Sequence, residues 1–132
     1  MIKYSIEAWI YNPIAKEILL LKVKTGQLSF WQPITGGIKS DESSEAACLR
    51  EIKEETGLAL ACSNLTGHGD FTVKIDKNLT IHKNLFLVLT EQKDIQISDE
   101  HVGAQWVALN KVSSQLYWPS NQATFEIITE KL

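Results

Sequence analysis

The sequence predicts an α/β domain, because stretches typical of buried strands alternate with stretches typical of amphipathic helices. Residues Ile2 to Tyr11 are rich in β-branched and aromatic side chains, and Glu17 to Val23 has the run ILLL at its centre. The apolar run LFLVL at residues 85–89 has the pattern of a central, buried strand. One helical pattern ends before Gly57, and Pro119 suits the first turn of a C-terminal helix.

The two N-terminal strands are expected to pair as a hairpin, because Asn12-Pro13 breaks the chain between them. The first strand is expected at an edge of the sheet, where it offers a surface for a homodimer, although nothing in the residues excludes a monomer. Further along, Gly67-His68-Gly69-Asp70 predicts a turn before strands over 71–75 and 80–90. The whole chain, residues 1–132, is expected to form one domain.

Toward the C-terminus, residues 104–109 predict a strand, and Asn110 is the expected cap of a short helix through Gln115. The last helix is expected to bury an apolar stripe on the protein. Its members are Phe125, Ile127 or Ile128, and Leu132.

Composition and charge exclude several classes of function. A hydrophobic content of 44% with 22% charged residues is ordinary for a globular domain. The formal net charge of -3 gives no general attraction to nucleic acid or to an anionic membrane, so neither is an expected partner. Lys3 and Glu7 interrupt the N-terminal apolar run, which argues against a signal peptide or membrane span and favours a cytoplasmic location. Cys48 and Cys62 have no metal-ligand spacing and are expected to pack structurally.

Three glutamates, Glu51, Glu54 and Glu55, fall on one arc of the helix that ends before Gly57. Neighbouring carboxylates raise the cost of ionising one another, so a positive group is expected among them. Mg²⁺ or Mn²⁺ fits, because both are hard cations that take oxygen ligands. Arg50 is another positive group, and its planar guanidinium holds carboxylates in a fixed orientation. The alternative is an ordinary solvated helix face rich in glutamate.

The spacing around these glutamates favours a catalytic site over a solvated face. The fixed positions between residues 36 and 58 are Gly36, Glu42, Arg50, Glu51, Ile52, Glu54, Glu55, Gly57 and Leu58. A chance match over so many positions is very improbable, and the pattern resembles the Nudix box, which encodes the loop and catalytic helix of the Nudix hydrolases. Many members of that family have an acidic residue at the position of Lys39 and a glycine at that of Asp41, so this loop departs from the family pattern.

The resemblance implies a Nudix fold, in which a mixed β-sheet is sandwiched between α-helices. It also implies a pyrophosphohydrolase that uses Mg²⁺ or Mn²⁺ to cleave a nucleoside diphosphate linked to a further group. By the same resemblance, the metal ligands are Glu51, Glu54, Glu55 and the backbone carbonyl of Gly36. The implied catalytic residues are Glu54, Glu51, Arg50 and Glu100. The implied structural residues of the box are Gly36, Glu42 and Gly57.

The residue types of this segment suit such a role physically. Gly36 and Gly37 let the backbone turn sharply and approach a diphosphate closely. Ser43 or Asp41 caps the start of the helix, and Gly57 suits the left-handed conformation that ends one. The side chains expected to face the core are those of Cys48, Leu49 and Ile52.

Glu100 is a candidate for a further role in the reaction. Many Nudix enzymes have an additional carboxylate before the last strand, where it binds metal or deprotonates the attacking water. Glu100 occupies this place in the run Glu100-His101-Val102. The alternative is a solvated loop acid without a function.

The runs FWQ at residues 30–32 and WPSNQA at residues 118–123 resemble bacterial dihydroneopterin triphosphate pyrophosphatases, which belong to the Nudix group. Candidate substrate contacts are therefore Trp31, Lys24, Trp118 and Asn121. Trp31 is either a core aromatic or a stacking wall for a base or pterin. Trp118 either borders the pocket or covers the sheet edge.

Three lysines and a histidine on strands have a functional and an inert interpretation. Lys22 and Lys24 either lie near the substrate or keep a strand edge soluble. His82 and Lys83 either touch a phosphate or a base edge or are ordinary strand residues.

Three functions remain open on the sequence alone. The first is hydrolysis of a nucleoside or pterin triphosphate with release of pyrophosphate. The second is hydrolysis of a dinucleoside polyphosphate or a nucleotide sugar. The third is a sensor that binds a small nucleotide-like molecule without cleaving it. Sensors of this fold usually lose box carboxylates, whereas Glu51, Glu54 and Glu55 are all present.

Overall fold

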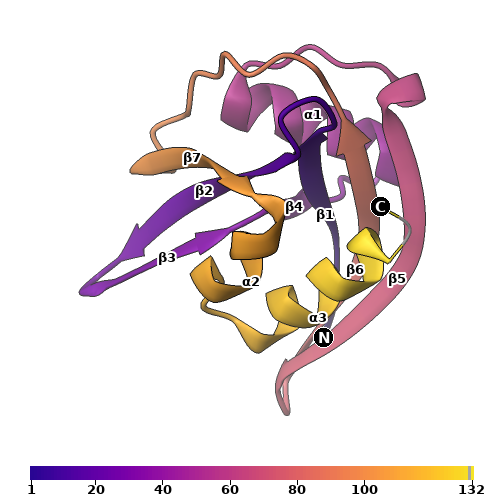
Figure 1. The fold of residues 1–132 in the computed structure, drawn as a ribbon. Coiled ribbons are helices and arrows are strands. Elements are labelled where there is room, and N and C mark those ends of the chain that lie inside the picture. Colours follow the sequence, from indigo (N-terminus) through magenta and orange to yellow (C-terminus); the bar gives the residue numbers. More distant parts are fainter. Residues whose placement is uncertain (131) are drawn as a thin grey trace.

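The computed structural model describes residues 1–130 and 132, and in these residues seven strands form one mixed sheet with helices on both faces (Figure 1). In chain order the elements are β1 (Ile2–Asn12), β2 (Glu17–Thr25), β3 (Leu28–Gln32), β4 (Ile34–Gly37), α1 (Ser44–Thr56), η1 (Cys62–Asn64), β5 (Leu65–Asp76), β6 (Leu79–Leu89), β7 (Gly103–Ala108), η2 (Leu109–Lys111), α2 (Val112–Gln115) and α3 (Pro119–Thr129). The predicted α/β class and the layered arrangement implied by the resemblance are both confirmed.

The strand β1 lies inside the sheet and has partners on both edges. Its residues Ile2 to Tyr11 pair in parallel with Thr80 to Leu89 of β6, and β5 continues the sheet beyond β6. On the other edge, β1 pairs with β4 over Ser5 to Ala8, and with β2 at Tyr11 and Asn12. The prediction that β1 lies at an edge of the sheet is therefore wrong. The predicted hairpin of β1 and β2 forms only next to the turn that joins them. β2 pairs further with β3 and β7.

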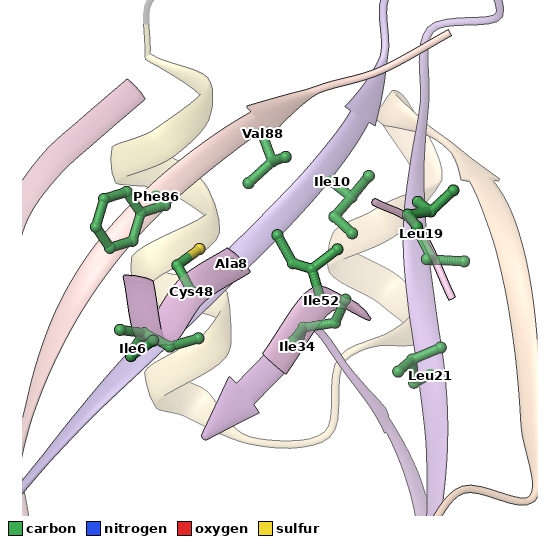
Figure 2. Packing of buried hydrophobic residues seen from close by; sticks show 12 residues of the cluster. Ile6, Ala8, Ile10, Leu19, Leu21, Ile34, Cys48, Ile52, Phe86 and Val88 are labelled. Carbon is green, nitrogen blue, oxygen red and sulfur yellow. The ribbon is translucent and has the colours of Figure 1, made fainter. Parts of the chain in front are cut away.

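One hydrophobic core fills the space between the sheet and α1 (Figure 2). Ile6 and Ile10 of β1 point into it, because alternate residues of a strand face the same side. Cys48 and Ile52 of α1 pack against them and are fully buried, as their positions on the helix predicted. Leu49, which was expected beside them, is half-buried. This core fixes α1 against the sheet, since burial of apolar surface is the main stabilising contribution.

A second core lies on the opposite face of the sheet, beneath α3. Trp9 of β1 packs there against Phe125 and Ile128, with its ring centroid 5.4 Å from that of Phe125. The predicted stripe is correct for these two helix residues but wrong for Leu132, which is 48% exposed because α3 ends at Thr129. Across the part of the chain described, none of the helices combines the length and the apolar character needed to cross a membrane.

Two local predictions differ from the structure. Residues 67–70 do not form a turn but lie within β5, where the pairing register with β6 shifts between Gly67 and Asp70. Gly69 has a positive φ of 82°, which glycine adopts easily. The shift in register therefore uses the same residue type that a turn would use. Asn110 does not cap a helix, because it lies inside η2, and the residue that precedes α2 is Lys111.

Candidate active site

Helix α1 is flanked at both ends by residues that suit helix caps. Ser43 is the N-cap, because its side-chain oxygen accepts a hydrogen bond from the backbone N–H of Ala46 at 3.1 Å. Of the two predicted caps, Ser43 and Asp41, the structure selects the first. At the other end Gly57 has a φ of 79°, and its N–H donates to the carbonyl of Lys53 at 2.9 Å. With both ends fixed, the glutamates of the helix project in a defined direction.

Arg50 connects the carboxylates of α1 to the preceding loop. Its Nη2 and Nε donate to the two carboxylate oxygens of Glu42 at 2.6 and 3.1 Å. Its Nη1 donates to Glu51 at 2.8 Å and to Glu54 at 3.3 Å. Nη2 also donates to the carbonyl of Gly37 at 2.9 Å. The planar guanidinium therefore braces loop and helix together, which a single point charge would not do.

Glu42 receives a further hydrogen bond from the loop itself. The backbone N–H of Lys39 donates to Glu42 at 2.9 Å. The hydrogen bond from Arg50, followed by that from Lys39, lowers the pKa of Glu42 to about 2. Because Lys39 contributes its backbone to this contact, the loop closes on Glu42 even though its side chain departs from the family pattern.

Glu51 packs directly against Gly36 of β4. A Cβ built on Gly36 would lie 2.1 Å from Cδ of Glu51, far inside any permitted contact. Only glycine therefore allows the helix carboxylate to reach the strand at this point. In the sheet, Gly36 is the register partner of Ile6, so this close approach occurs on the face that α1 covers.

Glu55 is the most deeply buried acid of the cluster. It is 5% exposed, and its Oε2 has no hydrogen-bond partner among the described residues. Burial first, and then the charges of Glu51, Glu100 and Glu54, raise its pKa to about 8. Burial also raises the pKa of Glu51, against the opposing effect of Arg50. The site therefore favours any partner that supplies positive charge.

A hard divalent cation fits the donor groups of this cluster. Within residues 1–130 and 132, no three acidic, histidine or cysteine side chains converge tightly enough to hold a metal ion as they stand. Two of the carboxylates, Glu51 and Glu54, are instead hydrogen-bonded to Arg50. The unpartnered oxygen of buried Glu55 nevertheless lacks a positive partner, and carboxylate oxygens are the ligands that Mg²⁺ and Mn²⁺ prefer.

Glu100 lies near the acidic cluster although it precedes β7 in the chain. It is exposed, and its charge contributes to the raised pKa values of both Glu51 and Glu55. The next residue, His101, is buried, and its Nδ1 has no partner in the described part of the chain. Burial lowers the pKa of His101, with Glu100 opposing the effect. The charge of Glu100 therefore acts on two of the acids of α1, although the two segments are far apart in the chain.

A pocket of about 540 Å³ lies beside this cluster, on the side of the sheet that α3 borders. Gly36 and Gly37 line one end of it, and Lys83, Trp118 and Asn121 line other parts. The volume is in the usual range for a small-molecule site. Gly36 both lines the pocket and contacts Glu51, so this one residue of β4 connects the pocket with the acidic helix.

The predicted substrate contacts divide into two groups. Trp118 and Asn121 line the pocket, and the ring of Trp118 packs edge-on against Tyr117 at 4.8 Å between centroids. Trp31 and Lys24 are not among the lining residues. Trp31 packs against the second core with the ammonium of Lys22 5.7 Å above its ring, and Lys24 is exposed near the end of β2.

One buried charge was missed by the sequence reasoning. Glu7 of β1 is 0% exposed, and it accepts hydrogen bonds from Lys83 at 2.7 Å, from Asn121 at 3.0 Å and from Trp9 at 3.0 Å. A single acid in a strand is usually a solvated residue, so the sequence predicted no role for Glu7 beyond interrupting the N-terminal apolar run. Its available signal is that apolar residues surround it on both faces of the strand, from Ile6 onward.

Comparison with known proteins identifies what this arrangement is similar to. The NUDIX domain model matches residues 2–128. A dihydroneopterin triphosphate diphosphatase from Haemophilus influenzae is 30% identical over 120 residues, which cover 81% of this chain and 75% of that protein. The structure of the E. coli dihydroneopterin triphosphate pyrophosphohydrolase superposes with a TM-score of 0.80 at 22% identity, covering 96% of this chain and 95% of that one. A C. elegans Ap4A hydrolase gives a TM-score of 0.73 at 22% identity, with 96% of each chain covered.

Proposed function

The chain belongs to the Nudix hydrolase family, and from this premise we propose that it cleaves the triphosphate of a nucleoside or pterin, using Mg²⁺ or Mn²⁺. The observation that carries the proposal is the position of Gly36, which lines the pocket and contacts Glu51. A ligand whose ring occupies the pocket thereby directs its phosphates toward the carboxylates of α1. The full set of box carboxylates supports hydrolysis over a purely sensory role.

The proposed ligands of the cation are Glu51, Glu54, Glu55 and the carbonyl of Gly36. The buried oxygen of Glu55 that lacks a partner supports this assignment. When bound, the cation neutralises phosphate oxygens and lowers the pKa of a coordinated water. Arg50 holds Glu51 and Glu54 in place beforehand through its two hydrogen bonds from Nη1.

The reaction needs a group that accepts a proton from water. Hydrolysis forms a bond between the water oxygen and phosphorus, breaks the bridging P–O bond, and transfers the bridging oxygen to the departing pyrophosphate. The proton that water loses goes to a carboxylate, and Glu54 and Glu100 are the candidates. Both are exposed, so water reaches them directly. Glu55 is less suited to this role, because it is only 5% exposed and water does not reach it as freely.

The pocket supplies surfaces for a flat ring. Trp118 presents an aromatic side chain that is 40% exposed, and Val73 and Ile81 add apolar surface from β5 and β6. Aromatic faces bind flat rings by stacking. Gly36 and Gly37 leave room for phosphates at the other end, since neither carries a side chain.

A substrate screen tests the proposal. Phosphate release would be measured with Mg²⁺ and a coupled pyrophosphatase over nucleoside triphosphates, dihydroneopterin triphosphate, dinucleoside polyphosphates and nucleotide sugars. Release of pyrophosphate from triphosphates alone is the expected result. Mononucleotide products from dinucleotides would move the assignment to that class, and binding without any cleavage would indicate a sensor.

Two variants test the acidic residues directly. We expect Glu54→Gln and Glu55→Gln to keep the fold and to lose metal-dependent turnover by at least about a hundredfold, the size of a lost electrostatic or general-base contribution. Glu126→Gln, on the exposed side of α3, is the matched control. Near-normal turnover in both purified site variants would contradict the assignment.

A further inference from the structure

We propose that the outer edge of β5 is a homodimer interface, in which residues 70–74 of two copies pair as antiparallel strands about a two-fold axis at Thr72. The partner is a second copy of this chain, and the contact joins the two sheets into one. This inference concerns assembly and does not depend on the function proposed above.

The segment lies at a free edge of the sheet. β5 is the last strand beyond β6, and it forms the outer margin of the sheet in Figure 1. Among the described residues, no backbone hydrogen bond outside the pairing with β6 involves residues 70–74. Alternate N–H and C=O groups of an edge strand point away from the sheet. The segment therefore offers the donors and acceptors that a further strand requires.

The pairing of β5 with β6 is regular over this segment and irregular on both sides of it. Residues 70–74 pair with β6 in unbroken register, and the register shifts before Asp70 and after Lys74. Irregularities of this kind bend and twist a strand. The regular segment therefore has its middle at Thr72, and a two-fold axis there places the same segment of a second copy alongside it in the opposite direction.

The sequence of the segment is self-complementary about Thr72. In an antiparallel pair centred there, Asp70 of each copy lies opposite Lys74 of the other. Phe71 lies opposite Val73, and Thr72 lies opposite its own copy. Opposite charges, aromatic side chains beside β-branched ones, and pairs of threonines all stabilise neighbouring strands. Each of the five positions thus meets a suitable partner.

The neighbouring registers lack this complementarity. Registers that keep the same faces of the two sheets together differ by a shift of two residues, because side chains alternate between the faces. A shift in either direction places Asp70 or Lys74 opposite Thr72, so that neither charge meets its opposite. Edge strands that avoid association carry repelling charges or irregularities. Here the irregularities lie outside the segment, and the charges attract each other.

The polar side chains of the segment are accessible and partly held in position. Asp70, Thr72 and Lys74 share one face of the strand and are all exposed. The carboxylate of Asp70 lies 3.3 Å from Nε2 of His82 in β6, and Oγ1 of Thr72 lies 3.4 Å from Nδ1 of the same ring. These contacts order Asp70 and Thr72 beforehand, which lowers the entropy lost on association. A carboxylate accepts several hydrogen bonds, so Asp70 still has acceptor sites for a lysine.

The proposed interface adjoins the pocket on the other face of the strand. Val73 lines the pocket, and Phe71 packs against the second core. In the proposed register Phe71 of the second copy lies opposite Val73. Dimerisation therefore extends the apolar surface beside the pocket.

The size of the contact determines how stable the dimer is. Five residues from each strand bury less than the roughly 1,200 Å² found in stable complexes. We therefore expect a dimer in exchange with the monomer, which forms at high concentration and dissociates on dilution.

Sedimentation equilibrium of the wild-type protein from about 10 µM to about 1 mM tests the assembly. The average mass should rise with concentration toward twice that of the single chain. Hydrogen exchange at the same concentrations identifies the surface, because amides that point outward from an edge strand exchange freely until they are paired. Exchange within residues 70–74 should slow at least about threefold at the highest concentration. A monomer throughout, or a dimer without this protection, would overturn the proposal.

Two charge-reversal variants test the register. Asp70→Lys leaves only lysines at the two charged positions, and Lys74→Asp leaves only aspartates. Each variant alone is expected to raise the Kd of the dimer at least about tenfold, because both cross-strand pairs become repulsive. An equal mixture of the two presents opposite charges and should dimerise at least as strongly as wild type.

Lys111→Asp is the matched control, since it makes the same change of charge at an exposed residue of η2 and should leave the Kd unchanged. Variants that dimerise alone as strongly as wild type would overturn the proposal, as would a mixture that does not associate. If either variant does not fold, concentration-dependent protection of residues 70–74 in the wild-type protein decides.

Discussion

The carboxylate of Glu51 lies against the backbone of Gly36 with no side chain between them, and a Cβ on Gly36 would come within 2.1 Å of Cδ of Glu51. This contact joins the helix that carries the acidic cluster to the strand that borders the pocket. The position of the carboxylates is therefore determined by the position of the sheet.

Gly36→Ala is expected to separate these two elements. Because the added methyl group overlaps Glu51, either the carboxylate or β4 has to move, which we expect to lower the free energy of unfolding by about 1 to 3 kcal/mol. Turnover should fall at least about tenfold, since small displacements of positioned groups are costly in catalysis. Urea unfolding and steady-state kinetics measure the two effects. Gly37→Ala is the control for stability, because a Cβ there meets nothing within 4 Å.

Glu42 is expected to make stability depend on pH in acid. Its pKa is about 2 in the folded protein and 4.5 in its ordinary state, so the unfolded chain binds more protons between these values. The contribution of the contact with Arg50 is complete above the higher value and is lost as pH falls through the lower one. Urea unfolding of wild type between about pH 5.5 and 2.5 should show a steeper loss than unfolding of Glu42→Gln. Parallel curves would contradict this assignment of the acid sensitivity.

Glu55 is expected to have the opposite effect on the metal-free protein. Its pKa is raised from 4.5 to about 8, so the folded state binds the additional proton and stability falls as pH rises across this interval. Glu55→Gln should therefore be more stable than wild type at about pH 9 and similar at about pH 4, with a chelator present. Each 1 kcal/mol corresponds to a Tm change of about 3 to 5 °C in a domain of this size.

Added Mg²⁺ is expected to reverse the behaviour of Glu55. A cation that binds ionised carboxylates of the folded state stabilises it by an amount that rises with the logarithm of its concentration divided by its Kd. The Tm of wild type should then rise with Mg²⁺ at alkaline pH, and that of Glu55→Gln should rise less. An equal rise in Tm for both proteins would show that Glu55 does not bind the cation.

Glu100→Gln is expected to separate the two roles proposed for Glu100. If Glu100 accepts the proton of the attacking water, the loss of turnover should shrink as pH rises, because hydroxide becomes more available. If it holds the cation, the loss should be independent of pH. Profiles of kcat against pH for wild type and variant decide between them, with a retained Tm as evidence that both are folded.

Short-range patterns predicted helix α1 well. The cap at Ser43, the left-handed glycine at Gly57 and the buried face at Cys48 and Ile52 are all set by residues within one or two helical turns. The central strand at residues 85–89 was equally evident, because a continuous apolar run of that length leaves little choice. The acidic cluster followed from the spacing of residues on the same helix.

Long-range pairing accounts for the predictions that failed. The strand β1 was placed at an edge because its parallel partner β6 follows much later in the chain, where no local pattern indicates the pairing. The irregularity at Gly67 to Asp70 uses the same residue types as a turn, so composition does not separate the two. Leu132 continued a helical stripe beyond the point where the helix ends. The role of Glu7 depends on hydrogen bonds from Lys83 and Asn121, which are distant in the sequence.

The parallel pairing of β1 with β6 has a consequence for how the chain folds. Glu7 and Lys83 lie 76 residues apart, so the middle of the sheet forms only after a long segment has closed into a loop. Such closure costs entropy before any contact compensates for it, and folds rich in distant pairings reach the native state slowly. During synthesis on the ribosome, the apolar residues of β1 therefore remain unpaired with β6 until β6 has emerged. In that interval the nascent chain is most exposed to misassociation with other chains.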